Sequence, residues 1–276
     1  MQFAFTEEQD LLRSQARDYL GGRFPSEDEW DPSSWREIAE LGWTGVSIPE
    51  ERGGAGLGFL EEGILFEELG RALYPGPYFA TVGLALPALS PERQEQVARG
   101  ERTYSLALDG LPAPDEELVD EVAKVEDDAV VEQVRVRALA ALSLEAVGIA
   151  QRALELGVEH AKTREQFGRP IGVYQAVSHP LADTFVETEL ARSLAYWAAW
   201  CVDEGDDLAP VAVAAAKAYA GDAAVAACER SIQVHGGIGF TWEHVLHRYY
   251  KRALWIQAFG GYGREHRARV AAFLLD

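Results

Sequence analysis

The sequence contains few basic residues and few cysteines. Its 276 residues include 25 lysines and arginines against 45 aspartates and glutamates, a formal net charge of −20. Phosphate backbones are bound by basic surfaces, so this composition argues against a nucleic-acid-binding protein. The two cysteines, Cys201 and Cys228, lie in apolar, alanine-rich stretches. Two are too few for a disulfide framework or a cysteine-based zinc site, so we expect buried free thiols and no metal site.

Membrane and export signals are also missing. There is no run of about 18 consecutive apolar residues, so no membrane span is expected. The first residues, Met1 to Glu8, lack the basic and then apolar pattern of a signal peptide. We therefore expect a cytoplasmic protein. With 48% hydrophobic and 25% charged residues, the composition predicts a globular fold with a buried core.

The acidic residues are concentrated in the first half of the chain. Residues 1–136 carry 11 bases and 29 acids, a net charge of −18, whereas residues 137–276 carry a net charge of −2. An anionic ligand is therefore more easily held by the second half. Taken alone, the imbalance is explained more simply by a solvated acidic surface on the first half.

The first hundred residues predict a helical domain. Two capping boxes, each a Ser or Thr followed three residues later by Glu or Gln, predict helix starts at Thr6 and Ser34. Residues 42–58 are rich in Gly and Pro and predict a long ordered loop. Residues 59–73 and 79–99 return to helical spacing.

Residues 101–136 differ from the sequence on either side. A short strand is predicted from 103 to 108, and residues 109–132 hold ten acids, one base and two prolines, which predicts an exposed connector. Helices are then predicted over residues 138–163, 173–204, 209–235, 241–259 and 263–274. The predicted fold is mainly α, with an N-terminal helical domain (1–100), a vestigial β segment (101–136) and a C-terminal four-helix bundle (137–276).

Two loop motifs in the second half carry groups that can bind a ligand. From Arg164 to Pro170, glycine and proline end one helix and leave the Arg164 guanidinium available to a phosphate or carboxylate. From Gln233 to Gly239, three glycines leave the backbone uncovered by side chains, which allows close approach of a ligand. Thr241 is predicted to cap the next helix. The glycine spacing is not that of a dinucleotide fingerprint. Taken singly, the first motif is better explained as a helix end with an arginine that favours the helix dipole, and the second is equally explained as an ordinary turn between helices.

Taken together and in order, these features resemble the acyl-CoA dehydrogenase family. The resemblance lies in the loop at 42–58, the segment from Arg164 to Gln175, the glycine turn at 236–239 and the terminal helices. It covers residues 1–100 and 138–276. In addition, the segment from Gly239 to Arg252 is similar to variants found in actinobacterial steroid and bile-acid side-chain degradation.

The resemblance implies a flavoenzyme whose FAD is shared between subunits. In the family, FAD takes a hydride from the β-carbon of an acyl-CoA after a glutamate removes the α-proton, and electrons pass to an electron-transfer flavoprotein. The family's arginine that reaches the FAD pyrophosphate of a neighbouring subunit corresponds to Arg164. The other cofactor-binding residues implied by the resemblance are Gln166, Phe167, Tyr174, Gln175, Gln233, Gly236 and Gly237.

The catalytic positions depart from the family. The usual glutamate falls at Gly260 and the alternative one at Ala138, so neither carries a carboxylate and no catalytic residue is predicted. The substrate-binding arginine falls at Leu139, and Val136 stands where the family often has aspartate. The middle sheet domain, which forms one wall around the flavin and the substrate, is replaced by the short acidic connector.

These departures favour the degenerate subunit of a hetero-oligomer, such as a heterotetramer. Its partner would be a longer acyl-CoA dehydrogenase homologue that carries the glutamate, with an acyl-CoA as substrate. Two alternatives stay open: a non-catalytic assembly subunit without flavin, and a self-sufficient flavoenzyme with a relocated base. The candidates for a relocated base are Asp109, Glu243, His244 and His247. Trp255 and Phe259 are expected to fill the space beside the lost base.

Overall fold

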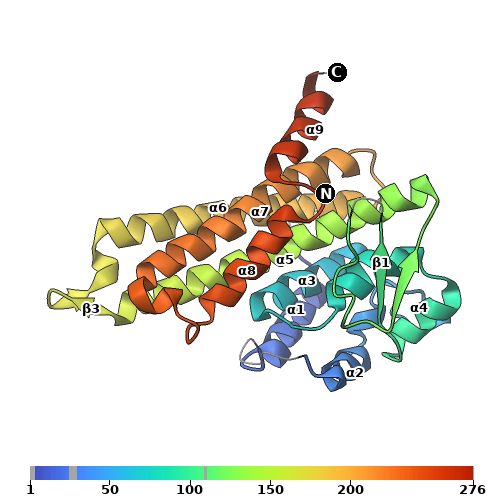
Figure 1. Ribbon diagram of the computed structural model, residues 1–276, viewed down its shortest axis with the longest axis horizontal. Coiled ribbons are helices and arrows are strands. Elements are labelled where there is room, and N and C mark those ends of the chain that lie inside the picture. Colours follow the sequence, from blue (N-terminus) through green and yellow to red (C-terminus); the bar gives the residue numbers. More distant parts are fainter. Residues whose placement is uncertain (1–3, 25–29, 109–110, 276) are drawn as a thin grey trace.

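The computed structural model describes residues 4–24, 30–108 and 111–275. An N-terminal helical part packs beside a bundle of long helices, and a two-stranded sheet lies at one end (Figure 1). The N-terminal elements are α1 (Glu7–Leu20), α2 (Pro32–Glu40), η1 (Trp43–Gly45), η2 (Glu50–Arg52), α3 (Phe59–Ala72), η3 (Phe79–Ala85), η4 (Leu86–Ala88) and α4 (Pro91–Ala98). The elements that follow are β1 (Tyr104–Ala107), β2 (Glu121–Lys124), α5 (Asp128–Thr163), β3 (Glu165–Gln166), β4 (Arg169–Pro170), η5 (Ile171–Val173), α6 (Gln175–Asp203), α7 (Ala209–His235), η6 (Gly236–Phe240), α8 (Leu246–Ala258) and α9 (Gly263–Leu275). The predicted fold class, mainly α with a vestigial β segment, is confirmed.

The first two helices differ in how well their starts were predicted. The capping box of α1 is present. The Gln9 backbone N–H donates to the Thr6 hydroxyl at 3.2 Å, and the Thr6 backbone N–H donates to the Gln9 side-chain oxygen at 3.0 Å. The box predicted at Ser34 is wrong. The α2 helix begins at Pro32, and Asp31 is its N-cap. Proline at the first helical position pre-sets the backbone, and aspartate is a strong cap, so the helix begins earlier than predicted.

The predicted loop at 42–58 is ordered by its own backbone. The backbone N–H of Gly56 donates to the Ile48 carbonyl at 2.8 Å, and that of Ala55 donates to the Gly45 carbonyl at 2.9 Å. Gly54 is required between them, because a Cβ there would lie 2.0 Å from the Ile48 oxygen. The loop therefore forms a compact wall with two short helical turns, η1 and η2.

The middle of the chain is reduced to one pair of strands within the described residues. The predicted strand at 103–108 is confirmed as β1, which pairs in parallel with β2, with Tyr104 opposite Glu121. The second strand was not predicted, because it lies among acidic residues that favour a solvated connector. The predicted helix from residue 138 begins instead at Asp128. The Asp127 carboxylate caps it by accepting from the Ala129 backbone N–H at 2.9 Å.

The bundle is built around α7. Within the described residues one stretch, Ala209–Phe240, is long and apolar enough by composition to cross a membrane, but 72% of the tested window is buried in the fold. This burial identifies α7 as the core helix of the bundle. Small side chains allow its neighbours to approach closely. Cys201 and Cys228 are buried free thiols, as predicted.

Thr241 does not cap α8, contrary to the prediction. Its hydroxyl donates to the Ile238 carbonyl at 2.8 Å, and α8 begins only at Leu246. Because the hydroxyl closes the preceding η6 turn, it does not reach the helix. Residues 241–245 therefore form an irregular connection that carries His244.

The N-terminal part contacts the bundle where α3 crosses α5. A Cβ on Gly148 of α5 would lie 1.9 Å from the Glu67 carbonyl oxygen, and one on Gly70 of α3 would lie 2.3 Å from the Glu145 carbonyl oxygen. The two backbones are thus in direct contact, which only glycine permits at these positions.

Ion pairs surround this crossing. Three glutamates of α3 are almost fully buried, and each faces an arginine from another helix. The closest pairs are Glu62 with Arg137 of α5 (2.5 Å), Glu68 with Arg17 of α1 (2.6 Å) and Glu67 with Arg192 of α6 (2.9 Å). A buried carboxylate without such a partner is strongly destabilising, so these pairs tie α1, α5 and α6 to α3.

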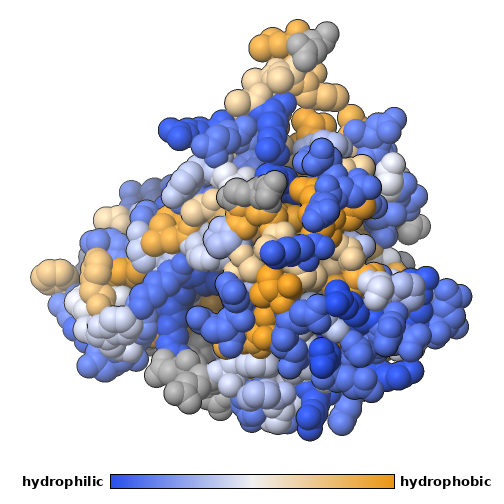
Figure 2. Space-filling view, turned by 45° about the vertical axis from the view of Figure 1, so that its right-hand side comes forward, coloured by the Kyte–Doolittle hydropathy of each residue, from blue (hydrophilic) through white to orange (hydrophobic). Residues whose placement is uncertain are grey.

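The C-terminal helix α9 extends away from the bundle (Figure 1). Its last side chains, Phe273, Leu274 and Leu275, are exposed and form an apolar tip at the top of Figure 2. Exposed clusters of large apolar side chains commonly mark protein–protein contacts.

The glycine crossing gives a first test of the fold. Gly148→Ala places a methyl group against the Glu67 carbonyl, and we expect the free energy of unfolding to fall by at least the ~1–3 kcal/mol typical of an overpacked core. Gly237→Ala is the matched control, because a Cβ there meets no atom within 4 Å. Urea unfolding followed by circular dichroism measures both. Equal midpoints for the two variants would contradict the proposed contact.

Candidate functional site

The first motif forms a hairpin at the far end of the bundle. The Arg164 backbone N–H donates to the His160 carbonyl at 2.8 Å, which ends α5 and leaves the arginine side chain exposed. Phe167 and Gly168 turn the chain between β3 and β4 with φ of 54° and 76°, the left-handed values that a two-residue hairpin needs. The Phe167 ring is 91% exposed. The hairpin lies at one tip of the molecule (Figure 1). Its large, exposed apolar ring is therefore available for contact with another molecule.

Tyr174 braces the hairpin against the start of α6. Its hydroxyl accepts from Arg169 Nε at 3.1 Å and donates to the Gln166 carbonyl at 3.3 Å. The Arg169 guanidinium also lies 4.6 Å from the centre of the Tyr174 ring. Gln166 and Gln175 have exposed side chains on the same segment. Arg169 was not predicted as a site residue, although it lies within the motif.

The second motif is open backbone at the end of α7. Gly236 ends the helix with a φ of +62°, and Cβ atoms built on Gly236 and Gly237 would meet no atom within 4 Å. Gln233, one turn earlier, is exposed. Backbone groups next to empty space are accessible to an anion.

The structure brings the two motifs to the same end of the bundle. The α5 and α7 helices run in parallel, and the rings of His160 and His235 near their ends stack with centroids 4.2 Å apart. His160 was missed from the sequence. The available signal was its spacing, since it precedes Arg164 by four residues and so shares its side of the helix.

Gly260, where the resemblance sets the base, lies beside Leu139, where it sets the substrate-binding arginine. Gly260 has a φ of +71°, and a Cβ built on it would lie 2.6 Å from Cδ2 of Leu139. Leu139 and its neighbour Ala138 are buried among apolar groups. The place where the resemblance sets a carboxylate beside an arginine is therefore closed by an apolar side chain.

Two buried basic side chains, Lys217 and His266, contact backbone carbonyls of the turn around Gly260. Lys217 Nζ donates to the carbonyls of Gln257 (3.2 Å) and Gly261 (3.5 Å), and His266 Nε2 lies 3.1 Å from the Gly261 oxygen. Burial lowers the pKa of Lys217 to about 8. Burial and the Lys217 charge lower the pKa of His266 to about 4, so this imidazole is neutral at pH 7. Both side chains fasten the turn.

Aromatic rings fill the neighbouring space. Phe79 of η3 meets Trp255 and Phe259 edge-on, with centroids 5.8 and 5.5 Å away. Trp255 and Phe259 also lie 5.0 Å apart. This packing agrees with the expectation that the two side chains of α8 and its end fill the volume next to the lost base.

The candidates for a relocated base lie at the other end of α8. Glu243 is exposed, and a hydrogen bond with Thr241 lowers its pKa. His247 Nδ1 lies 2.8 Å from the His244 carbonyl. The 13 residues of α8 span about 20 Å between this end and Gly260. Asp109 lies outside the described residues.

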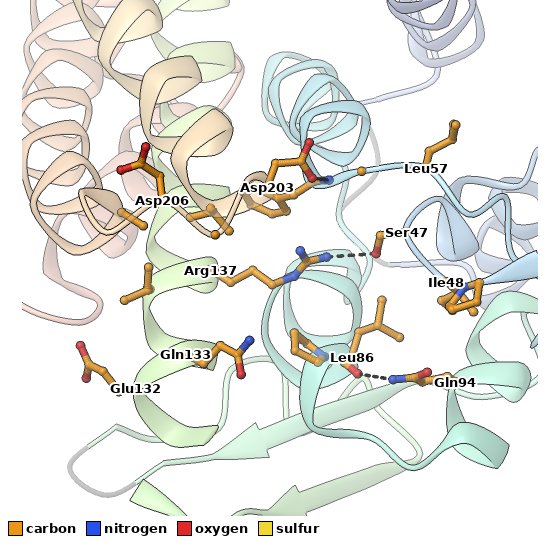
Figure 3. Close-up of a pocket in the computed structure, with 18 of the residues that line it drawn as sticks. Ser47, Ile48, Leu57, Leu86, Gln94, Glu132, Gln133, Arg137, Asp203 and Asp206 are labelled. Atoms are coloured by element: carbon orange, nitrogen blue, oxygen red, sulfur yellow. Dashed lines mark hydrogen bonds between the residues drawn. The ribbon is translucent and has the colours of Figure 1, made fainter. Parts of the chain in front are cut away.

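The largest of the described cavities, about 770 Å³, is far from the hairpin. Figure 3 shows Arg137 reaching into it from α5 toward Ser47, with which it bonds at 3.1 Å. Arg137 is about 40 Å along α5 from Arg164. Acidic side chains also line the cavity, namely Glu132, Asp203 and Asp206. Their charge opposes a polyphosphate ligand such as coenzyme A.

Comparison with known proteins identifies the class. The chain matches "Acyl-CoA dehydrogenase, N-terminal domain" over residues 6–92 and "Acyl-CoA dehydrogenase, C-terminal domain" over residues 137–275. It belongs to the acyl-CoA dehydrogenase family.

Some relatives match along most of both chains. Acyl-CoA dehydrogenase IpdE2 of Mycobacterium tuberculosis is 33% identical over 267 residues, which cover 83% of this chain and 82% of that protein. A variant of the Tcur3481–Tcur3483 steroid ACAD superposes with a TM-score of 0.87 at 25% identity, covering 97% of this chain and 98% of that chain. The ChsE4–ChsE5 complex of Mycobacterium tuberculosis shares the fold, with a TM-score of 0.88 at 24% identity and coverage of 100% and 99%.

Family membership gives FAD as the cofactor. The end of the bundle fits this group. A diphosphate suits the planar guanidinium of Arg164, which is exposed. No side chain blocks its approach to the backbone at Gly236 and Gly237, where the Gly236 N–H itself donates to the Ile232 and Gln233 carbonyls. The 137–276 segment that carries them is nearly neutral overall, so a bound anion is not repelled by an excess of acid.

The contact at Gly260 gives a second test. Gly260→Ala is expected to lower the free energy of unfolding by ~1–2 kcal/mol for the left-handed backbone, with more from the clash with Leu139. On a Leu139→Ala background the same substitution loses the clash, so its effect shrinks by ~0.5–3 kcal/mol. Chemical denaturation of the four proteins measures the difference. Strictly additive effects would show that the two residues are not in contact.

Lys217 gives a test by pH. Its pKa is about 8 in the folded protein, against the ordinary 10.5 when unfolded. Between these pH values the unfolded chain binds the extra proton, so the free energy of unfolding rises with pH by about 3 kcal/mol in total and is level below pH 8. Lys217→Met should remove this rise, whereas Lys162→Met, at an exposed lysine, should keep it. Urea unfolding from pH 7 to pH 10.5 measures this dependence. If the free energy of unfolding rose equally with pH in all three proteins, the rise would not be due to Lys217.

Proposed function

We propose that this chain is the FAD-sharing subunit without a catalytic base in a heteromeric, cytoplasmic acyl-CoA dehydrogenase, such as a heterotetramer. A longer homologue supplies the glutamate. The observation that carries the proposal is the packing of Leu139 against Gly260. Glycine carries no carboxylate, and an apolar side chain occupies the space beside it, where the family places its base.

The cofactor residues support a site that is shared between chains. Arg164 and Phe167 are exposed, and the hairpin segment that carries them lies at the opposite end of α5 from Ala138 and Leu139 (Figure 1). The described middle segment offers only the β1–β2 pair, which is too little to wall a flavin ring. The proposed FAD-binding residues are Arg164, Gln166, Phe167, Tyr174, Gln175, Gln233, Gly236 and Gly237. They would hold the diphosphate and adenosine end, and the partner would surround the ring.

The proposed reaction is divided between the two chains: this chain binds part of the cofactor, and the partner removes the proton. When bound, FAD supplies a hydride acceptor for the β-carbon of a CoA thioester. In this chain the Arg164 guanidinium offsets the diphosphate charge, and the backbone at Gly236 and Gly237 lets the anion approach. The turn at Gly260 offers no proton acceptor, so removal of the α-proton belongs to the partner's glutamate. Electron-transfer flavoprotein is the proposed final acceptor.

A steroid side-chain thioester is the proposed substrate class. Support comes from the structural relative at 25% identity, which is described as a steroid ACAD and is named for two proteins, Tcur3481 and Tcur3483. The acid-lined cavity beside Arg137 opposes the phosphates of coenzyme A, which also favours binding of the thioester chiefly by the partner.

Co-expression with the longer homologue tests the proposal. We expect about one FAD for each pair of unlike chains. Arg164→Gln in this chain should weaken FAD binding about 10- to 100-fold, the loss of a charge-assisted hydrogen bond. Arg99→Gln, which removes an exposed arginine of α4, is the matched control and should leave the affinity unchanged. Flavin fluorescence and absorbance measure occupancy and affinity.

Three results would contradict the proposal in different ways. Stoichiometric flavin on this chain alone would remove the need for sharing. Activity of the isolated chain that is lost in Glu243→Gln or His247→Ala would establish a relocated base. A colourless complex with the longer homologue would identify a non-catalytic assembly subunit.

A further inference from the structure

Three histidine rings form a stack that the proposed function does not use. His235 at the end of α7 lies between His160 of α5 and His244 of the connection before α8. Its ring centroid is 4.2 Å from that of His160, at 28° between planes, and 4.3 Å from that of His244, at 53°. The rings come from three separate segments, so only the tertiary fold brings them together.

The stack is not a metal centre. His235 Nδ1 lies 2.8 Å from the Ser231 carbonyl, and His244 Nδ1 accepts from the Leu246 backbone N–H at 3.3 Å. In the part of the chain that the structure describes, no group of three His, Cys, Asp or Glu side chains is arranged to hold a metal ion. The His160 and His235 rings are stacked and the His244 ring is tilted against His235, and their nitrogens do not form a metal-binding group.

The stack lies where an anion needs additional positive charge. The α5 and α7 helices both end here, and each C-terminus carries a partial negative charge of about half a unit. A bound diphosphate adds about two further negative charges. Residues 159–169 provide three cations, Lys162, Arg164 and Arg169, and two carboxylates, Glu159 and Glu165. The helix ends, these carboxylates and the diphosphate together exceed the charge of the three cations.

Imidazole can supply the missing charge near neutral pH. Without an anion, burial, His235 and Arg164 lower the pKa of His160. Burial, His235, His160 and His247 likewise lower the pKa of His244. Arg164 from the end of α5 thus acts on His160, and His247 from α8 acts on His244. An anion beside the rings acts in the opposite sense and favours protonation.

We propose that His160 and His244, packed on either side of His235, form a proton-accepting floor beneath the FAD diphosphate, so that this chain takes up a proton as it binds the cofactor. The inference rests on the proposed function, because it uses the diphosphate site defined by Arg164, Gly236 and Gly237. Its consequence is that FAD affinity increases as the pH falls from 8 to 6. The limit is about tenfold per pH unit for one whole proton.

The test uses the complex of both chains after removal of its flavin. FAD rebinding is followed by fluorescence quenching at pH 8, 7 and 6. Proton uptake is measured at pH 7 by calorimetry in two buffers of different ionisation enthalpy. The variant is His160→Gln with His244→Asn, two partly exposed positions that spare the buried His235. His179→Gln, at an exposed histidine of α6, is the matched control, and circular dichroism checks that each variant is folded.

We expect the wild-type complex and His179→Gln to bind FAD about tenfold more tightly at pH 6 than at pH 8, with measurable proton uptake. The double variant should gain less than twofold and take up no proton. Rebinding that depends on Arg164 but has the same pH profile in the double variant would overturn the histidine stack and leave the shared FAD site standing. Rebinding that is insensitive to Arg164→Gln, or absent, would overturn both.

Discussion

Direct contact between the backbones of α3 and α5 is the constraint on which the rest of the structure depends. At Gly70 and Gly148 any side chain would overlap a carbonyl of the facing helix. The two helices cross at this contact, and the N-terminal part is thereby fixed against the bundle although the middle segment is reduced to one pair of strands.

Some of the excess acidic residues in the first half of the chain are buried around this crossing. A solvated surface was the simpler explanation of the excess acid in residues 1–136. Three of those acids, Glu62, Glu67 and Glu68, are instead buried on α3 and paired with arginines from three other helices. Part of the negative charge is therefore structural. Its arginine partners are correspondingly removed from any role in binding an external anion.

The long helix α5 separates two chemically different ends. Near its first turns lie Val136 and Leu139, at positions where the resemblance sets polar residues, and a cavity lined by acids and arginines. At its last turn Arg164 and the hairpin are exposed, and His160 is partly exposed beside the buried His235. A rigid helix about 50 Å long keeps these ends apart, which suits a subunit that lends binding groups but performs no proton transfer of its own.

The sequence by itself determined the helical periodicity, the capping box at Thr6, the strand at 103–108 and the absence of a carboxylate at Gly260 and Ala138. These depend on local spacing or on residue identity alone. It did not determine the start of α2, the start of α5 at Asp128, or that Thr241 closes the preceding turn, because neighbouring side chains compete for the same backbone groups. Only the tertiary structure decided that Leu139 faces Gly260 and that His160, His235 and His244 stack. These residues are far apart along the chain, and helix packing alone brings them into contact.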